Sequence, residues 1–208
     1  MSTERWWILI ICPFWLGGGP FWLPVSRSAA STSIATSDVA ATISTLIGRE
    51  DSSIVAGHDD RRAPLRSRVI AFHRAGDLLR ACAERGLRVA WATRGAPQDV
   101  KDFQRAVGCS DAVHAVVNSG EVDHRKPAPD IVQAAVDAAG APARRAVMVG
   151  DAVYDLRAAR EVGSHTSPCS AAASAKPSCV RRPAAIYANC ADLLTQHDTS
   201  PIGALLRS

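Results

Sequence analysis

The chain has 208 residues, of which 47% are hydrophobic, so it is long enough to bury one core of moderate size. Its net charge is +4, but arginine pairs such as Arg61 with Arg62 and Arg144 with Arg145 are separated by apolar stretches with few aromatic residues. This scatter is typical of solvated faces and argues against a nucleic-acid groove. The six cysteines include no Cys-x-x-Cys pair, which argues against a zinc site and favours a reducing, cytoplasmic compartment.

Residues 1–43 form an apolar and then Ser/Ala-rich leader, in which residues 6–26 carry no charge. Residues 6–12 are apolar enough for a buried strand. The uncharged stretch also fits a secretory signal or a membrane anchor, which would make the protein secreted or membrane-associated. Three prolines and the glycine run 17–19 are unfavourable for one continuous membrane helix.

Alternating strands and helices follow the leader. We expect residues 69–85 to form a helix with Leu78, Leu79 and Cys82 inward and Gly86 as its end. Strands are predicted at 87–92, 112–117 and 146–150, and helices at 97–107, 130–139 and 153–162. Residues 164–183 are a low-complexity segment, and residues 184–208 hold a final strand and a short helix at 191–196. The alternation predicts an α/β fold with a parallel sheet.

Two aspartates follow the strand at 146–150. Asp151 comes directly after Gly150, which we expect to allow a tight turn, and Asp155 lies four residues further on. Carboxylates at the carboxyl end of a parallel strand lie where open α/β sheets bind ligands. Because close carboxylates repel and Mg²⁺ prefers oxygen ligands, the spacing indicates a metal site. An aspartate that merely caps the next helix explains the same pattern.

A hydroxyl and a lysine precede these aspartates. Thr93, Arg94 and Gly95 follow the strand at 87–92 and offer a hydroxyl and backbone N–H groups ahead of a helix, as anion sites do. Lys126 precedes a Pro-Ala-Pro segment and Asp130, which we expect to cap the next helix. A lysine on such a stiff loop suits a phosphate, although an ordinary surface lysine and a loop hydroxyl are the plain alternatives.

In this order the residues resemble the motifs of the haloacid dehalogenase-like (HAD) hydrolase superfamily, in particular its phosphoglycolate-phosphatase-like and sugar-phosphatase-like branch. Thr93 matches the second motif, Lys126 the third, and Gly150-Asp151 with Asp155 the fourth. The resemblance covers residues 65–163.

The resemblance implies a Rossmann-like, three-layer core, with residues 44–68 as a shortened remnant of the helical cap. It also implies Mg²⁺-dependent phosphoryl transfer from a small phosphorylated metabolite through an aspartyl-phosphate. Thr93, Arg94, Gly95 and Lys126 would then hold the phosphate, with Lys126 as the catalytic lysine. Asp151 and Asp155 would hold Mg²⁺, and weakly, for the reason given next.

The first motif of the superfamily, a strand that ends Asp-x-Asp-Gly-Thr, is missing. The only acidic residue before Asp38 is Glu4, and no Asp-x-Asp occurs anywhere in the chain. The nearest imitation is Glu121-Val122-Asp123, on a predicted loop. If residues 6–12 form the first strand, Cys12 stands near the position of the nucleophile. Covalent catalysis depends on that nucleophile.

Two hypotheses for function remain. The first is a HAD-like phosphatase that acts on a small phosphorylated metabolite. The second is a catalytically inactive HAD-like protein, either a degenerate product whose residues 1–43 and 164–183 have left the frame of the family, or a binding module. The sequence identifies neither the substrate nor the oligomeric state.

Overall fold

The computed structural model describes residues 7–10, 14–16, 46–49, 53, 69–93, 97–118, 120–122, 124, 128–150, 153–168 and 187–207. The chain divides into two compact units, one made of Met1–Trp15 with Ala71–Ser208 and the other of Leu16–Ile70. In the second unit few residues are described, and the predicted division of this region into a leader (1–43) and a cap-like segment (44–68) stays a prediction.

The first unit is built on a five-stranded parallel sheet with the strand order β5-β4-β1-β6-β7. Its strands are β1 (Trp7–Ile10), β4 (Arg88–Ala92), β5 (Val113–Val117), β6 (Ala146–Gly150) and β7 (His165–Pro168). A separate two-stranded sheet pairs β2 (Phe14–Leu16) with β3 (Val69–Ala71). The helices are α3 (Ala75–Glu84), α4 (Pro97–Val107), α5 (Asp130–Ala139), α6 (Val153–Val162), α7 (Cys190–Thr195) and α8 (Pro201–Arg207), with short 3-10 turns at Ser110–Ala112, Ala143–Arg145 and His197–Thr199.

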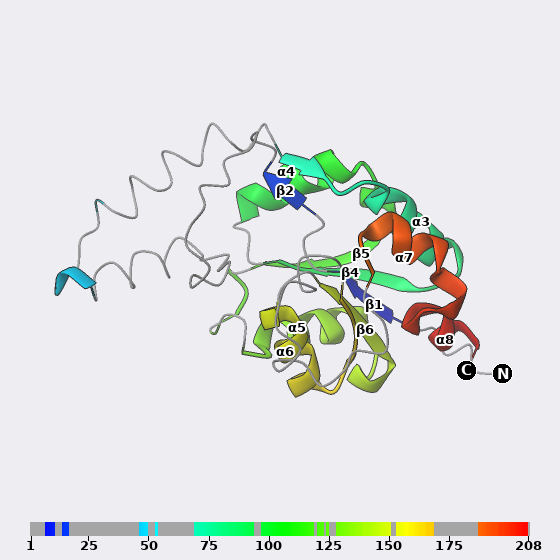
Figure 1. Ribbon diagram of the computed structural model, residues 1–208. Helices are drawn as coiled ribbons and strands as arrows, with labels where there is room; N and C mark the ends of the chain where they lie inside the picture. The colour runs from blue at the N-terminus through cyan, green and yellow to red at the C-terminus, as the bar shows by residue number, and fades with distance from the viewer. Residues whose placement is uncertain are drawn as a thin grey trace. The chain divides into compact units, whose positions relative to one another are not determined.

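The two faces of the large sheet bury different side chains, because successive residues of a strand point to opposite faces. Val89 and Trp91 of β4 belong to a core with Leu78, Leu79 and Cys82 of α3. The alternate residues of β4 and β6 belong to a second core with α5 and α6: Ala90, Ala92, Ala146 and Met148. Figure 1 shows α5 and α6 on one side of the sheet and α3, α4 and α7 on the other. The predicted α/β fold with a parallel sheet is therefore confirmed.

The strand β1 settles one of the open interpretations of the leader. Trp7 pairs with Arg88 of β4 and with Ala146 of β6, and the pairing continues in register to Ile10. Both edges of β1 are thus hydrogen-bonded within the sheet, and the strand interpretation of this segment is confirmed over Trp7–Ile10. None of the helices that the structure describes is long and apolar enough to cross a bilayer.

The predicted helix at 69–85 is wrong in its first six residues. Val69–Ala71 is strand β3, and α3 begins only at Ala75. Arg74, at the helix N-cap, has a φ of 61° in the left-handed region, which no helical residue adopts. The end of the helix is as predicted, because Gly86 has a φ of +83° and its N–H donates to the carbonyl of Ala83.

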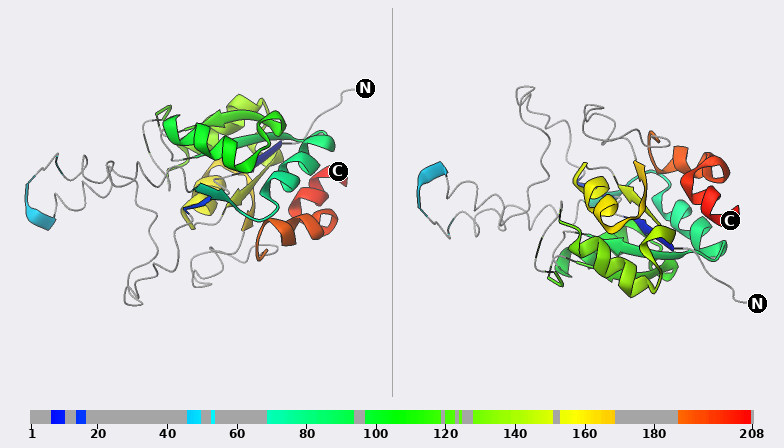
Figure 2. Two further views of the ribbon diagram at one scale, coloured as in Figure 1. Left: turned by 90° about the horizontal axis from the view of Figure 1, so that it is seen from above. Right: turned by 90° about the horizontal axis from the view of Figure 1, so that it is seen from below.

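The remaining predicted elements agree with the structure to within one residue where they are described, except at the C-terminal end. Strand β7 is absent from the predicted elements, although it pairs with β6 at the start of the segment 164–183. The helix α8 is also absent from them. Figure 2 shows α7 next to α3, which explains the burial of Cys190 and Leu193 in the same core as Leu78.

Candidate functional site

The carboxyl ends of β4, β1 and β6 lie side by side at one edge of the sheet, because the three strands are parallel neighbours. Ile10, the last residue of β1, is paired with Trp91 on one side and with Val149 on the other. In the sequence, Thr93 follows Trp91 by two residues, as Gly150 follows Val149 by one. Two of the predicted motifs therefore begin at strand ends that flank β1, where parallel sheets bind ligands.

Thr93 is fixed at this edge. Its backbone N–H donates to the carbonyl of Val117 at 2.9 Å, which continues the pairing of β4 with β5 past the last residue of the strand. Thr93 is 1% exposed, so its side chain is packed inside the protein rather than on an open loop. Burial is what a ligand-binding hydroxyl at a strand end needs, and the plain alternative of a loop hydroxyl with no ligand stays open.

Asp155 is also buried, and Gly150 makes room for it. A Cβ atom on Gly150 would lie 2.8 Å from the Cβ of Asp155 and 3.1 Å from its Oδ2. Asp155 lies in the first turn of α6 and is 4% exposed. Gly150 is the last residue of β6 and has no positive φ, so the reason that the structure shows for this glycine is close packing. The expected tight turn would involve Asp151 and Ala152, which lie outside the described residues.

The loop after β5 is ordered by its own polar side chains. Asn118 donates its backbone N–H to a carboxylate oxygen of Glu121 at 3.1 Å, and its Oδ1 accepts from the N–H of Gly120 at 2.9 Å. Glu121, which begins the imitation of the missing motif, is therefore part of a turn on an exposed loop, as expected from its position.

Asp130 does not cap α5 in the way we expected. The helix begins at Asp130, Pro129 is the N-cap residue, and no side chain makes a cap hydrogen bond. Instead, Oδ2 of Asp130 accepts from the backbone N–H of His124 at 3.2 Å and lies 2.8 Å from His124 Nδ1. The hydrogen bond from the imidazole is the main reason that the pKa of Asp130 lies below its usual value.

One buried acid was not singled out from the sequence. Asp99, in the first turn of α4, is 2% exposed, and this helix follows the loop after Thr93. The available signal was Pro97 at the start of the helix with an acidic residue two positions later, a pattern that favours the positive end of the helix dipole.

Four of the predicted site residues lie outside the described residues: Arg94, Gly95, Lys126 and Asp151. The structure thus brings Thr93 and Asp155 to the strand ends on either side of β1 and leaves the other members as predictions. Within the described part of the chain, no group of three or more His, Cys, Asp or Glu side chains has metal-binding geometry. Of the two predicted metal ligands, Asp155 is the one among the described residues.

The cysteines that the structure describes do not offer a nucleophile. Cys82, Cys109 and Cys190 are buried and form no disulfide. Burial raises the pKa of Cys82 to about 12 and that of Cys109 to about 11, so both stay protonated and unreactive at neutral pH.

Comparison with known proteins agrees with the family that the sequence motifs resemble. The haloacid dehalogenase-like hydrolase family matches residues 29–163. A phosphoglycolate phosphatase of Rhodospirillum rubrum is 33% identical over 86 residues, which are 41% of this chain and 36% of that protein. The chain therefore aligns with about a third of the length of this relative.

Two solved structures show the same fold. A hydrolase from Pseudomonas syringae superimposes with a TM-score of 0.66 at 22% identity, over 80% of this chain and 78% of its own. CbbY from Rhodobacter sphaeroides, determined in complex with phosphate, superimposes with a TM-score of 0.57 at 23% identity, over 68% and 65% of the two chains.

Proposed function

The chain belongs to the haloacid dehalogenase-like hydrolase family, and we propose that its site binds the phosphate group of a small phosphorylated metabolite, as a phosphatase of this family does. The observation that carries the proposal is the burial of Thr93 and Asp155 at the ends of the two strands that flank β1. The names of a phosphoglycolate phosphatase and of a phosphate complex among its relatives support the choice of ligand.

We propose that Thr93 and the residues after it form the phosphate cradle. The N–H of Thr93 donates to the carbonyl of Val117, so in this proposal the hydroxyl is the group of Thr93 that meets a phosphate oxygen. The backbone N–H groups of Arg94 and Gly95, ahead of α4, would supply further donors. Lys126 would add the positive charge that a doubly negative ester needs.

We propose that Mg²⁺ binds at Asp151 and Asp155. The buried carboxylate of Asp155 fits the ion in kind, since Mg²⁺ takes hard oxygen ligands and one or two protein carboxylates together with substrate phosphate. The space left by Gly150 keeps that carboxylate close to the strand end. When bound, the ion would neutralise charge on the phosphate oxygens. The missing third carboxylate of the family makes its binding weak.

The absence of an aspartate near β1 favours phosphate binding without catalytic turnover. The family nucleophile belongs on the strand that corresponds to β1, and the chain has no aspartate before Asp38. The second candidate function is therefore a phosphate-binding module without phosphatase activity. A cytoplasmic location fits both candidates, and the buried thiols of Cys82, Cys109 and Cys190 support a reducing compartment.

Two measurements test the proposal. Titration calorimetry of the full chain with inorganic phosphate and Mg²⁺ should show saturable binding. Thr93→Val, which keeps the buried shape but removes the hydroxyl, should weaken it roughly tenfold, while Thr93→Ser should retain it. Asp155→Asn should make phosphate binding depend less on the concentration of Mg²⁺. Asp137→Asn, at an exposed position on α5, is the matched control and should change nothing.

Hydrolysis of p-nitrophenyl phosphate separates the two candidates. Turnover that requires Mg²⁺ and is lost in Asp151→Asn would assign a phosphatase. Phosphate binding with no hydrolysis above a protein-free blank would assign the binding module. Absence of saturable phosphate binding would contradict both.

A further inference from the structure

One peptide group links Thr93 to the carboxylate of Glu121. The backbone N–H of Thr93 donates to the carbonyl of Val117 at 2.9 Å, and the N–H of Asn118 donates to Oε1 of Glu121 at 3.1 Å. The carbonyl of Val117 and the N–H of Asn118 belong to the same planar peptide group, and in a trans peptide these two groups point in opposite directions. This peptide group therefore has the backbone of Thr93 on one side and the carboxylate of Glu121 on the other. We call these two hydrogen bonds the Glu121–Thr93 relay.

The relay lies at the edge of the large sheet. The strand β5 has β4 on one side, and among the described residues no strand pairs with its other side. The outward N–H groups of an edge strand lack the acceptors that a neighbouring strand would supply. Because the carbonyl of Val117 faces β4, the N–H of Asn118 faces outward, and the carboxylate of Glu121 accepts from it. A side chain thus takes the place of a neighbouring strand at the carboxyl end of β5.

Glu121 is itself held by the turn that begins at Asn118. Its backbone N–H donates to the carbonyl of Asn118 at 3.1 Å, and its Oε1 also accepts from the side-chain amide of Asn118. The same side chain accepts from the N–H of Gly120 at 2.9 Å through its Oδ1. These bonds fix the carboxylate of Glu121 beside the end of β5, although the residue is exposed.

The charge of Glu121 strengthens the hydrogen bond of Thr93. A carboxylate is a stronger acceptor than a neutral carbonyl. When it accepts from the N–H of a peptide group it polarises that group, and the carbonyl on the opposite side becomes a better acceptor. In the relay this carbonyl is that of Val117, and its donor is Thr93. The contact lies one residue past the end of β4, so it determines how firmly the backbone of Thr93 is held there.

We propose that Glu121 is a positioning residue for Thr93, which it fixes through the peptide group between Val117 and Asn118. The inference rests on the proposed function, in which the hydroxyl of Thr93 binds phosphate. Glu121 needs no contact with the ligand. The hydroxyl moves with the backbone of its own residue, and a binding group must be held to within about half an ångström. Firm placement raises affinity because less ordering remains to be done when phosphate binds.

The sign of the effect separates positioning from plain electrostatics. A carboxylate repels a phosphate dianion, so if Glu121 acted only through its charge, its removal would tighten phosphate binding. If Glu121 positions Thr93, its removal loosens the relay and weakens binding. The two accounts therefore predict opposite changes in affinity for the same variant, Glu121→Ala.

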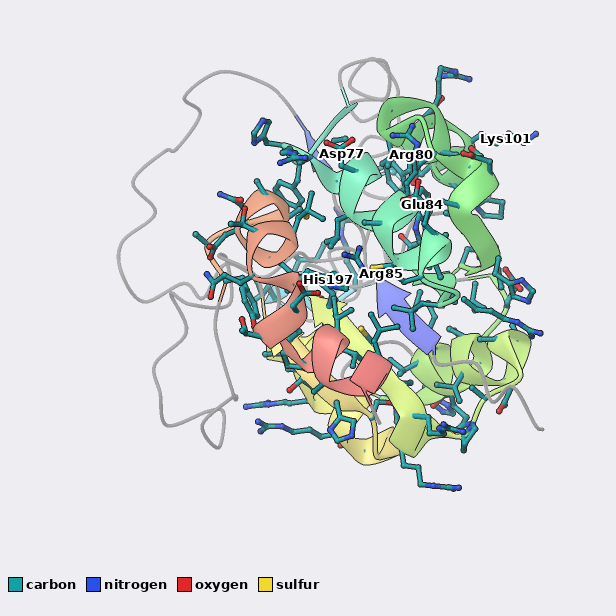
Figure 3. All side chains as sticks on the ribbon, turned by 90° about the vertical axis from the view of Figure 1, so that its right-hand side faces the viewer. Asp77, Arg80, Glu84, Arg85, Lys101 and His197 are labelled. Carbon is teal, nitrogen blue, oxygen red and sulfur yellow. The ribbon has the colours of Figure 1, made fainter. Side chains whose placement is uncertain are left out.

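Titration calorimetry of the full chain with inorganic phosphate and Mg²⁺ measures this change. Glu121→Ala should weaken phosphate binding roughly five- to tenfold, and Glu121→Gln, which keeps an acceptor oxygen, should weaken it only about twofold. In the Thr93→Val background no hydroxyl is left to position, so Glu121→Ala should have no further effect. Glu84→Ala removes the same charge from an exposed position of α3 (Figure 3) and is the matched control, which should leave phosphate affinity unchanged.

Hydrogen exchange of the ligand-free protein, followed by NMR, measures the relay without phosphate. The amide of Thr93 should exchange roughly fivefold faster in Glu121→Ala than in the wild type, because its acceptor is weakened, while the amides of β6 should keep their wild-type rates. A general loss of stability would instead speed up exchange throughout the sheet.

The failures of the two proposals look different. If Thr93→Val weakens phosphate binding while Glu121→Ala binds as the wild type does or more tightly, or if the two losses add, Glu121 does not position Thr93 and the proposed function stands. An equal loss in Glu121→Gln and Glu121→Ala, unchanged exchange at Thr93, or faster exchange throughout the sheet would also overturn the inference. If the wild type binds no phosphate, or Thr93→Val binds it equally well, the proposed function fails at Thr93 and the inference falls with it.

Discussion

Gly150 and Asp155 show at the scale of single residues how the site is held. The glycine ends β6, and the side chain of Asp155 fills the space where a Cβ atom would be. The carboxylate of Asp155 is buried, so its position is set by packing and not by solvent. In this chain, therefore, Gly150 and Asp155 of the fourth motif pack against each other. The glycine is required because any larger residue would meet the aspartate five positions later.

Gly150→Ala should displace Asp155. The new Cβ would lie 2.8 Å from the Cβ of Asp155, a distance that real structures avoid, so the aspartate or the strand end must shift. We expect Mg²⁺-dependent phosphate binding to weaken by roughly tenfold or more, since site geometry tolerates errors of only about half an ångström. Titration calorimetry with inorganic phosphate at several Mg²⁺ concentrations measures this.

Val149→Ala is the control for that substitution. Val149 precedes Gly150 in β6, is buried, and belongs to the other core, with α3. Its truncation should lower the free energy of unfolding by about 1–3 kcal/mol and leave Mg²⁺ and phosphate affinity unchanged. If Gly150→Ala behaves as Val149→Ala does, with lost stability and intact binding, the close packing has no role in the site.

Residue types in order were enough to predict where Thr93 and Asp155 lie, but not how they are held. Thr93 and Asp155 were expected at strand ends and are found there. The close packing of Gly150 against Asp155 was not expected, because a sequence does not distinguish a glycine needed for its backbone angle from one needed for space. Asp130 was expected as a helix cap, and only the folded loop shows that His124 takes its carboxylate.

At the scale of elements, the parallel sheet is complete at its centre because β1 is present. It is the central strand of the five and pairs on both edges, so an apolar segment without an Asp-x-Asp motif supplies the middle strand of the sheet. Apolar composition alone is enough for this, because a central parallel strand needs hydrophobic side chains on both faces and a continuous backbone ladder. The same apolar composition is why a secretory signal or a membrane anchor was also considered for this segment.

Restoring the first motif after the end of β1 should create activity. Ile10 is paired with Trp91 and Val149, and the residues two positions further along the sequence are Cys12, Thr93 and Asp151. We therefore expect residue 12 to correspond to the missing nucleophile. The double variant Cys12→Asp with Phe14→Asp, which rebuilds Asp-x-Asp, should hydrolyse p-nitrophenyl phosphate at least about 100-fold faster than the wild type with Mg²⁺, a fraction of what a nucleophile contributes in a mature site.

The uncharged counterpart, Cys12→Asn with Phe14→Asn, controls for polarity and shape. It should remain at the wild-type level, since an amide cannot form the acyl-phosphate. Equal rates for the two double variants would show that residue 12 does not face the bound phosphate, and the site would then need its nucleophile from elsewhere.

Periodicity gave most of the helices and strands, and its one large error has a local cause. The apolar spacing of α3 extends back through Val69 and Ile70, which are strand residues of β3. The break is made by Arg74 in a left-handed conformation. Arginine carries no preference for that region, so the sequence contains no signal for the break. Strand β7 was missed because its Thr, Ser and Pro resemble the low-complexity residues that follow it.

At the scale of the whole unit, the C-terminal segment closes the core beside α3 around a buried histidine. Ile202 of α8 and Leu193 of α7 are 0% exposed in the core that contains Leu78. His197, in the turn between these helices, is 3% exposed. Its Nδ1 lies 3.5 Å from Oδ1 of Asp198, and neither ring nitrogen has a hydrogen-bond partner.

Burial lowers the pKa of His197 below its ordinary 6.5, and the neighbouring cation of Arg85 on α3 adds to the effect, while Asp198 opposes it. Figure 3 shows Arg85 and His197 side by side between α3 and the C-terminal helices. The folded protein therefore keeps this ring neutral at a pH at which the unfolded chain already binds a proton. Protonation of His197, in the turn between α7 and α8, therefore opposes folding.

The stability of the unit should accordingly fall in mild acid. Well above pH 6.5 the ring is neutral in both states and its titration contributes nothing. As the pH falls below 6.5, the unfolded chain takes up the proton first, so the free energy of unfolding decreases until the pH reaches the lowered folded-state pKa.

Urea unfolding between pH 8 and pH 5 measures how steeply the free energy of unfolding falls with pH. His197→Phe, which keeps the buried ring and removes both unbonded nitrogens, should flatten it and leave the stability at pH 8 equal or higher. His165→Gln, at an exposed position on β7, should keep the wild-type slope. A slope that survives in His197→Phe would assign the acid sensitivity to another group and remove His197 as the link between pH and the closing of the core by α7 and α8.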